Sequence, residues 1–414
     1  MMQRKIIKSN FLTPLSSDKA ILLRDKYLII DESGQIENIT DNLLKSKNEL
    51  VYDFSSQIII PGLIDIHIHF PQLYSIGQHC NDLLKWLNNY IFDEERKFAN
   101  NEYAKSVSEK FFANLLKHGT TTAVVYSSIH KDATDIAFQT AKRLGNRVFI
   151  GKMMMDQNCP YFLKENTDTS IAESIELYEK WNGYNDRLYY IFSPRFAICC
   201  SMNLMKNIGK FIHRLPDGVY VQTHLSEDKS EIQTVKRLFP KYPNYTSIYE
   251  HSEILTAKTI VGHTLHLSEE EFRILQKYDV KIAHCPDANF FLKTGSFPYQ
   301  KIVNYGLLFG LGSDIGAGTN FSIFYIMKMM NYTQKEIDIS PEIAFYYATL
   351  GGAKCLSLAN KIGSIEVGKI ADLVLLKLPD YIDTSNEHSI LSYLSYQGGK
   401  ENIDKVMIAG EFVK

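Results

Sequence analysis

The chain of 414 residues is long enough to bury a sizeable core, and 45% hydrophobic with 22% charged residues is typical of a globular protein. A formal net charge of −2 argues against electrostatic capture of nucleic acid or of an anionic membrane surface. No apolar run approaches a membrane span, and the six cysteines show no CxxC spacing, so we expect a cytoplasmic protein with reduced thiols.

Short strand patterns occupy both ends of the chain. Residues 26–40 predict two strands around a turn, and residues 405–414 predict a further pair around Gly410. These strands find no partners in the pattern of the middle of the chain. We therefore expect residues 1–60 and 365–414 to pack on each other as a small β-sandwich.

Residues 61–364 alternate short apolar runs with longer amphipathic stretches. The apolar runs after the first lie at 120–127, 147–155, 188–193, 219–224, 259–263, 281–285 and 307–314. Helical patterns lie between them, such as 102–119, which ends on Gly119. This alternation predicts an α/β fold in which eight parallel strands close a (β/α)8 barrel of the TIM type. A doubly wound open sheet is the competing architecture, but no glycine-rich phosphate loop follows the first strand.

Histidines and an aspartate fall where the predicted barrel strands end. His67 and His69 share one face of the first strand, because side chains two residues apart on a strand point the same way. His224, His263 and Asp314 close three later runs. The carboxyl ends of barrel strands converge on one face, so these groups suit a Zn²⁺ ion with an open position for water. Taken singly, each is more commonly a buried histidine or a helix-capping aspartate.

Glu227 follows His224 by three residues, in the sequence THLSED. If the strand ends at His224, the glutamate lies in the next loop and can point back over the metal. A carboxylate beside a metal-activated water is suited to carry a proton between that water and a ring nitrogen. The alternative is an ordinary acidic residue at a helix N-terminus.

Several motifs resemble, in chain order, those of the guanine deaminases within the amidohydrolase superfamily of metal-dependent hydrolases. They include PGLIDIHIHFPQ, LLKWLNNYIFDEERKF, HGTTTAVVY, SPRF, THLSEDKSEI and SDIGAGT. The HxH pair alone is typical of the whole superfamily. HFPQ, SPRF and DIGAGT together indicate the guanine deaminases, and the resemblance covers nearly the whole chain.

The resemblance implies a role for each candidate residue. One Zn²⁺ per subunit would be bound by His67, His69, His224 and Asp314. The catalytic groups would be Glu227 as proton shuttle, with His263 and Asp314 orienting the attacking water. The purine would be positioned by Gln72, Arg195 and Phe196. A single metal is expected because Arg195 stands where relatives with two metals carry a modified lysine.

The implied reaction is attack of zinc-activated hydroxide on C2 of guanine, which gives xanthine and ammonia in purine catabolism. The resemblance also implies a homodimer. The alternatives are deamination of another ring, such as 8-oxoguanine or a triazine, and a non-catalytic scaffold that has lost its metal ligands. Asp287 departs from the family pattern, in which a neutral residue is usual. We expect its carboxylate either to alter substrate pairing or to face solvent.

Overall fold

The computed structural model describes residues 3–43, 50–80, 82–215 and 218–413. Parallel strands follow one another around a barrel, and they are β5 (Leu63–His69), β6 (Thr120–Tyr126), β7 (Arg147–Gly151), β9 (Leu188–Pro194), β10 (Tyr220–Leu225), β11 (Thr259–His263), β12 (Lys281–His284) and β13 (Phe309–Leu311). The short strand β8 (Met153–Met154) pairs with β9 beside this ring. The amide of Asp314 donates to the carbonyl of His67 at 2.8 Å and so joins the segment after β13 to β5. The predicted barrel is confirmed.

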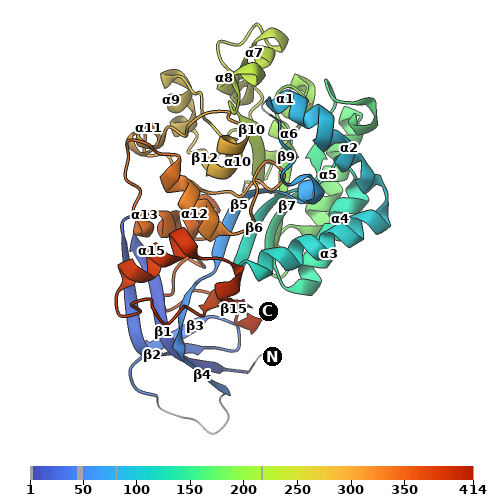
Figure 1. Cartoon of the computed structure of the whole chain (residues 1–414). Helices are drawn as coiled ribbons and strands as arrows, with labels where there is room; N and C mark the ends of the chain where they lie inside the picture. The colour runs from blue at the N-terminus through green and yellow to red at the C-terminus, as the bar shows by residue number, and fades with distance from the viewer. Residues whose placement is uncertain (1–2, 44–49, 81, 216–217, 414) are drawn as a thin grey trace.

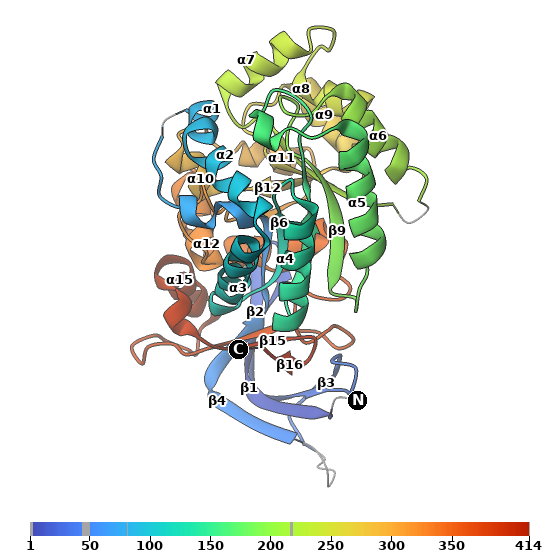
Figure 2. The same ribbon diagram turned by 90° about the vertical axis from the view of Figure 1, so that its right-hand side faces the viewer.

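Helices follow the barrel strands and cover the outside of the barrel (Figures 1 and 2). They are α3 (Asn101–Lys117), α4 (Lys131–Leu144), α5 (Thr167–Trp181), α6 (Met202–Ile212), α7 (Lys229–Leu238), α8 (Tyr245–His251), α9 (Glu269–Lys277), α10 (Pro286–Phe291), α11 (Tyr299–Asn304), α12 (Ile323–Tyr332), α13 (Pro341–Ala348) and α14 (Leu350–Cys355). Helix α3 shows why they form where the pattern predicts. Asn100 caps its first turn through Glu102 N and Tyr103 N, and Gly119 takes the left-handed conformation just beyond its end.

The terminal strands form a seven-stranded sheet below the barrel in Figure 1. In sheet order they are β16 (Glu411–Phe412), β15 (Ile403–Ile408), β14 (Leu373–Leu376), β4 (Leu50–Pro61), β1 (Lys5–Ser16), β2 (Lys19–Ile30) and β3 (Ile36–Thr40). Strands β4 and β14 pair antiparallel and so join the two ends of the chain. Helix α15 (Glu387–Gln397) precedes β15. Among the described residues, no helix has both the length and the apolar character needed to cross a membrane.

The described residues of the connection at 70–102 form a series of short helical turns. They are η1 (Phe70–Ser75), α1 (Leu83–Trp86), η2 (Leu87–Ile91), α2 (Phe92–Glu95) and η3 (Arg96–Ala99). Phe70, Trp86 and Phe92 are buried, so the segment packs against the barrel instead of extending into solvent. Leu83, Trp86 and Leu87 of this segment lie beside the carboxyl ends of the strands.

A buried ion pair links the barrel to the terminal sheet. Arg147, the first residue of β7, donates from Nε to Asp372 Oδ2 at 2.9 Å, and both side chains are almost inaccessible to solvent. Asp372 also accepts the amide of Ala409 at 2.7 Å. Removing one member of a buried pair leaves the other charge uncompensated.

Asp372→Ala is therefore expected to lower the free energy of unfolding by about 3–5 kcal/mol. Denaturant unfolding followed by circular dichroism measures the change. Lys361→Ala is the control, because Lys361 forms a half-exposed pair with Asp186 and such pairs contribute about 1 kcal/mol or less. A small decrease in the free energy of unfolding, equal in the two variants, would show that the buried pair does not stabilise the fold more than the exposed one.

Candidate metal centre and active site

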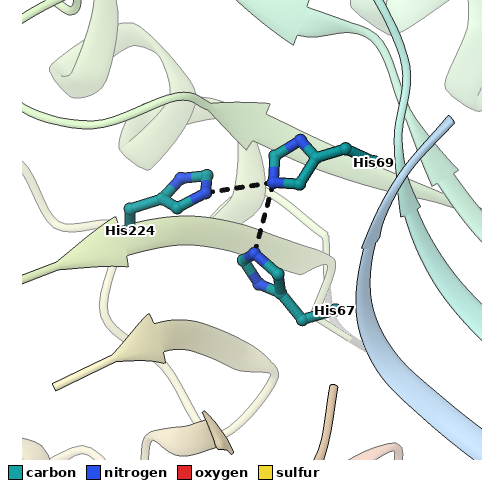
Figure 3. Close-up of side chains that lie close together, drawn as sticks. All are labelled: His67, His69 and His224. Atoms are coloured by element: carbon teal, nitrogen blue, oxygen red, sulfur yellow. Dashed lines mark hydrogen bonds between the residues drawn. The ribbon is translucent and has the colours of Figure 1, made fainter. Parts of the chain in front are cut away.

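Three histidines meet at the carboxyl ends of two barrel strands. His67 and His69 lie two residues apart on β5, so both side chains point to the same face, and His224 comes from β10. Figure 3 shows their rings turned toward one another. The Nε2 atom of His69 lies 3.3 Å from Nε2 of His67 and 3.2 Å from Nε2 of His224. The ligand atoms of these three residues all lie within 4.8 Å of one another.

Asp314 completes this set from the segment after β13. Its Oδ1 atom lies 3.4 Å from His67 Nε2 and 3.3 Å from His69 Nε2. Ligand atoms bound tetrahedrally at about 2.1 Å from one Zn²⁺ ion are separated by about 3.4 Å. The contacts of His69 with its three neighbours and of His67 with Asp314 have this spacing, so the four side chains suit a shared divalent cation.

Hydrogen bonds fix which ring nitrogen of two of the histidines faces the centre. His224 Nδ1 donates to the carbonyl of Arg195 at 2.7 Å, which leaves Nε2 as the lone-pair atom toward His69. His263 Nδ1 contacts Asn289 Oδ1 at 2.8 Å, and because an amide oxygen only accepts, Nδ1 carries the proton. The Nε2 atom of His263 is then an acceptor, and it lies 3.3 Å from Glu227 Oε2.

Burial keeps these imidazoles neutral. It lowers the pKa of His67 to about 3 and the pKa of His263 to about 4. For His69 and His224, burial and then the neighbouring histidine rings hold the pKa well below the usual value. Neutral imidazole is the form that binds a metal, so the set is ready to bind a cation at neutral pH.

The two carboxyl groups of the centre are shifted in the opposite direction. Burial raises the pKa of Asp314 to about 7. Burial, and then the nearby Asp314 carboxyl, raises the pKa of Glu227 well above its usual range. A raised pKa means that Glu227 keeps its proton to a higher pH than an ordinary glutamate does, which suits a group that carries a proton.

The backbone at two of these positions is unusual. Asp314 has φ +50° and His263 has φ +69°, both in the left-handed region that non-glycine residues seldom adopt. Asp314 lies three residues beyond Leu311, the end of β13, so it does not close the strand as the sequence pattern suggests. The strain places its carboxylate over the barrel mouth, and conformations of this kind cluster at functional sites.

One pocket joins the cation-binding set to the predicted base-binding residues. It contains about 390 Å³ of space between atoms, part of which is open to solvent. Its walls include His69, His224, Glu227, His263, Asp314, Gln72, Arg195 and Phe196. Leu83, Trp86 and Leu87 from the connection at 70–102 also line it. Every predicted site residue except His67 therefore lines one cavity.

Asp287 neither faces solvent nor lines this pocket. Its carboxylate accepts the amide of Thr319 at 2.6 Å and the hydroxyl of Thr319 at 2.8 Å. The expectation that it faces solvent is wrong, because the loop after Asp314 folds over helix α10 and buries it. Asp287 instead holds that loop in place.

The sequence analysis assigns no role to two buried residues of the site. Asn289 orients His263, as described above. Glu95, the last residue of α2, contacts Arg195 Nη1 through Oε2 at 2.6 Å and Gln72 Nε2 through Oε1 at 3.2 Å. It stands in the charged run DEERKF, which by pattern alone is typical of a solvated surface. Only its tertiary contacts identify it.

Comparisons with known proteins agree with this geometry. Residues 58–413 match the family model of the Amidohydrolase family. The guanine deaminase of Escherichia coli (strain K12) is 39% identical over 79% of this chain and 74% of that protein. The guanine deaminase of Dictyostelium discoideum is 33% identical over 99% of this chain and 98% of that protein.

Solved structures show the same relationship. A guanine deaminase from C. acetobutylicum, crystallised with guanine bound in its active site, matches with a TM-score of 0.92 and 33% identity over 100% of both chains. The match extends over the barrel and the terminal sheet together. The family model and these relatives cover the barrel from its first strand onward. The chain therefore belongs to the amidohydrolase family and, within it, to the guanine deaminases.

Proposed function

We propose that the protein hydrolyses guanine to xanthine and ammonia in the pocket lined by Arg195 and Glu227. This proposal rests on one observation: two sets of side chains line the same cavity. One set suits a cation and a water, and the other suits a purine base. The scaffold alternative predicts a broken ligand set, whereas this chain keeps every proposed ligand.

The proposed cofactor is one Zn²⁺ ion per subunit, held by His67, His69, His224 and Asp314. Such an ion lowers the pKa of a bound water toward ~7 and so supplies a nucleophile at neutral pH. Arg195 follows directly after β9 and cannot form the bridging lysine derivative of two-metal relatives. This supports a single ion.

The side chains of the protein then divide the remaining tasks. Asp314 and the unprotonated Nε2 of His263 hold the attacking water near C2 of guanine. Glu227 takes a proton from the attacking water and passes it to N3 of the ring. It then takes the proton of the hydroxyl group added at C2 and passes it to the amine, which leaves as ammonia while C2 becomes the carbonyl of xanthine. This role is supported by its position 3.3 Å from His263 and by its raised pKa.

The purine is held by Gln72, Arg195 and Phe196. Arg195 offers N–H donors to the carbonyl oxygen of guanine. Phe196 is 4% exposed and presents its ring to the cavity, where it can contact the base. Trp86 donates to the carbonyl of Gln78 at 2.8 Å and closes the same side of the pocket.

The absorbance change from guanine to xanthine, measured with zinc-loaded protein, tests the proposal. Adenine, 8-oxoguanine and a triazine serve as competing substrates. We expect turnover of guanine to exceed that of each competitor. Absence of guanine turnover in a zinc-replete, folded protein would contradict the proposal. Faster turnover of a competitor would identify that compound as the substrate instead of guanine.

We also propose a cytoplasmic homodimer that acts in purine catabolism. All six cysteines are unpaired, as in proteins of reducing compartments. The dimer rests on the family resemblance, and light scattering of the purified protein measures the mass directly. A monomeric mass at micromolar concentration would contradict it.

A further inference from the structure

Glu95 lies behind the base-binding side of the pocket. Its side chain is 1% exposed and is absent from the pocket lining, so it does not reach a ligand itself. Its two carboxylate oxygens contact Arg195 Nη1 and Gln72 Nε2, one each. A carboxylate only accepts hydrogen bonds, so both neighbours must turn a donor toward it.

This arrangement decides which atom of Gln72 is left for a ligand. One of the two N–H groups of the Gln72 amide donates to Glu95. If the amide turned over, Oε1 would face the carboxylate, so the amide has one orientation. Oε1 packs against Gly316, where an added Cβ would lie 2.1 Å from it, and it is the acceptor that this orientation leaves for the pocket.

Arg195 is fixed in a similar way. Nη1 is bound to Glu95, and the guanidinium lies 5.2 Å from the centre of the Phe92 ring. Its remaining N–H groups are donors for the pocket. Pairing with Glu95 keeps this buried charge compensated.

We infer that Glu95 is a positioning residue that makes the pocket specific for a carbonyl beside a ring N–H. The inference rests on the proposed function and names the determinant of its substrate class. In guanine, O6 accepts from Arg195 and N1–H donates to Gln72 Oε1. A ring with an amino group beside an unprotonated nitrogen reverses this pattern, so that donor faces donor and acceptor faces acceptor.

Glu95→Gln tests the inference with guanine and 2,6-diaminopurine as the two probes. 2,6-Diaminopurine keeps the 2-amino group that leaves but replaces the 6-carbonyl with an amino group. A carboxamide at position 95 can donate as well as accept, so Gln72 is free to turn over. We expect the ratio of kcat/KM for guanine to kcat/KM for 2,6-diaminopurine to fall about 10- to 100-fold. For guanine, the loss should appear mainly in KM.

Glu94→Gln is the matched control. Glu94 is the neighbouring buried glutamate, and it contacts the Tyr103 hydroxyl and Lys97 without reaching Gln72 or Arg195. The control should keep the wild-type ratio. A ratio within twofold of wild type in folded, metal-loaded Glu95→Gln would overturn the inference.

A second variant covers the case in which Glu95→Gln does not fold. Glu95→Asp keeps the charge but is shorter, so it cannot hold both neighbours, and the same ratio decides the outcome. If the wild-type protein does not turn over guanine, the proposed function fails separately. The ratio of the Kd values for guanine and 2,6-diaminopurine, measured by calorimetry on wild type and variant, then still tests the role of Glu95.

Discussion

His69→Ala is expected to release the metal and to lower guanine turnover by at least about 10³-fold, since a metal ion contributes several kcal/mol and each 1.36 kcal/mol is tenfold. His69 is the central member of the set, because its Nε2 lies within 3.3 Å of ligand atoms from His67, His224 and Asp314. Its loss leaves three of the four proposed ligands. Metal analysis of the purified variant and the rate of xanthine formation measure the two effects.

His284→Phe is the control for this experiment. His284 is the last residue of barrel strand β12 and is as buried as His69. Its imidazole ring stacks on Phe297 with 3.9 Å between the ring centres. Neither of its ring nitrogens has a hydrogen-bond partner among the described residues, so phenylalanine can replace its packing. Wild-type metal content is expected in this variant. Full metal content in His69→Ala would refute the assigned ligand set.

Metal removal from the wild-type protein tests, without a substitution, whether turnover depends on the metal. A chelator should abolish turnover, and added Zn²⁺ should restore it, because the buried neutral imidazoles remain in place to bind the ion. His69→Ala should not recover at the same zinc concentration. Chelator-resistant turnover would exclude a metal-dependent reaction.

The fold could be predicted from the sequence because its signals are local. Apolar runs of strand length, each followed by an amphipathic helix, are sufficient to indicate a parallel barrel. The helical turns of the connection at 70–102 could not be predicted in the same way. Phe70, Trp86 and Phe92 are buried by contact with the barrel, and that contact is a property of the assembled structure. The position of Asp314 beyond β13 likewise depends on a left-handed backbone that no spacing encodes.

The clustering of the proposed metal ligands could also be predicted, because strand ends converge on one face of a barrel and His67 and His69 share a strand face. Glu95 and Asn289 could not. Glu95 acts on Gln72, 23 residues earlier, and on Arg195, 100 residues later, so its partners meet only after folding. A residue that acts through other side chains leaves no pattern of its own in a single sequence.

Glu227→Gln is expected to lower kcat by about 10²- to 10⁴-fold while the metal content stays at the wild-type level. Glutamine keeps the size and the hydrogen-bonding atoms of the side chain but cannot carry a proton between the water and the ring. Glu227 is not one of the four proposed ligands, so its loss should not release the ion. Steady-state kinetics on guanine and metal analysis of the same preparation give both quantities.

Asp228→Asn is the matched control for Glu227→Gln, since Asp228 is the adjacent carboxylate and caps α7 through Ser230 N at 2.7 Å. Asparagine caps helices as well as aspartate does, so near-normal kcat is expected. Near-normal kcat in Glu227→Gln would instead assign proton transfer to another group. His263 is then the next candidate for proton transfer, because its Nε2 lies 3.3 Å from Glu227 Oε2 and can accept a proton. A loss of metal together with activity would mean that Glu227 helps to hold the ion, which separates a binding role from a catalytic one.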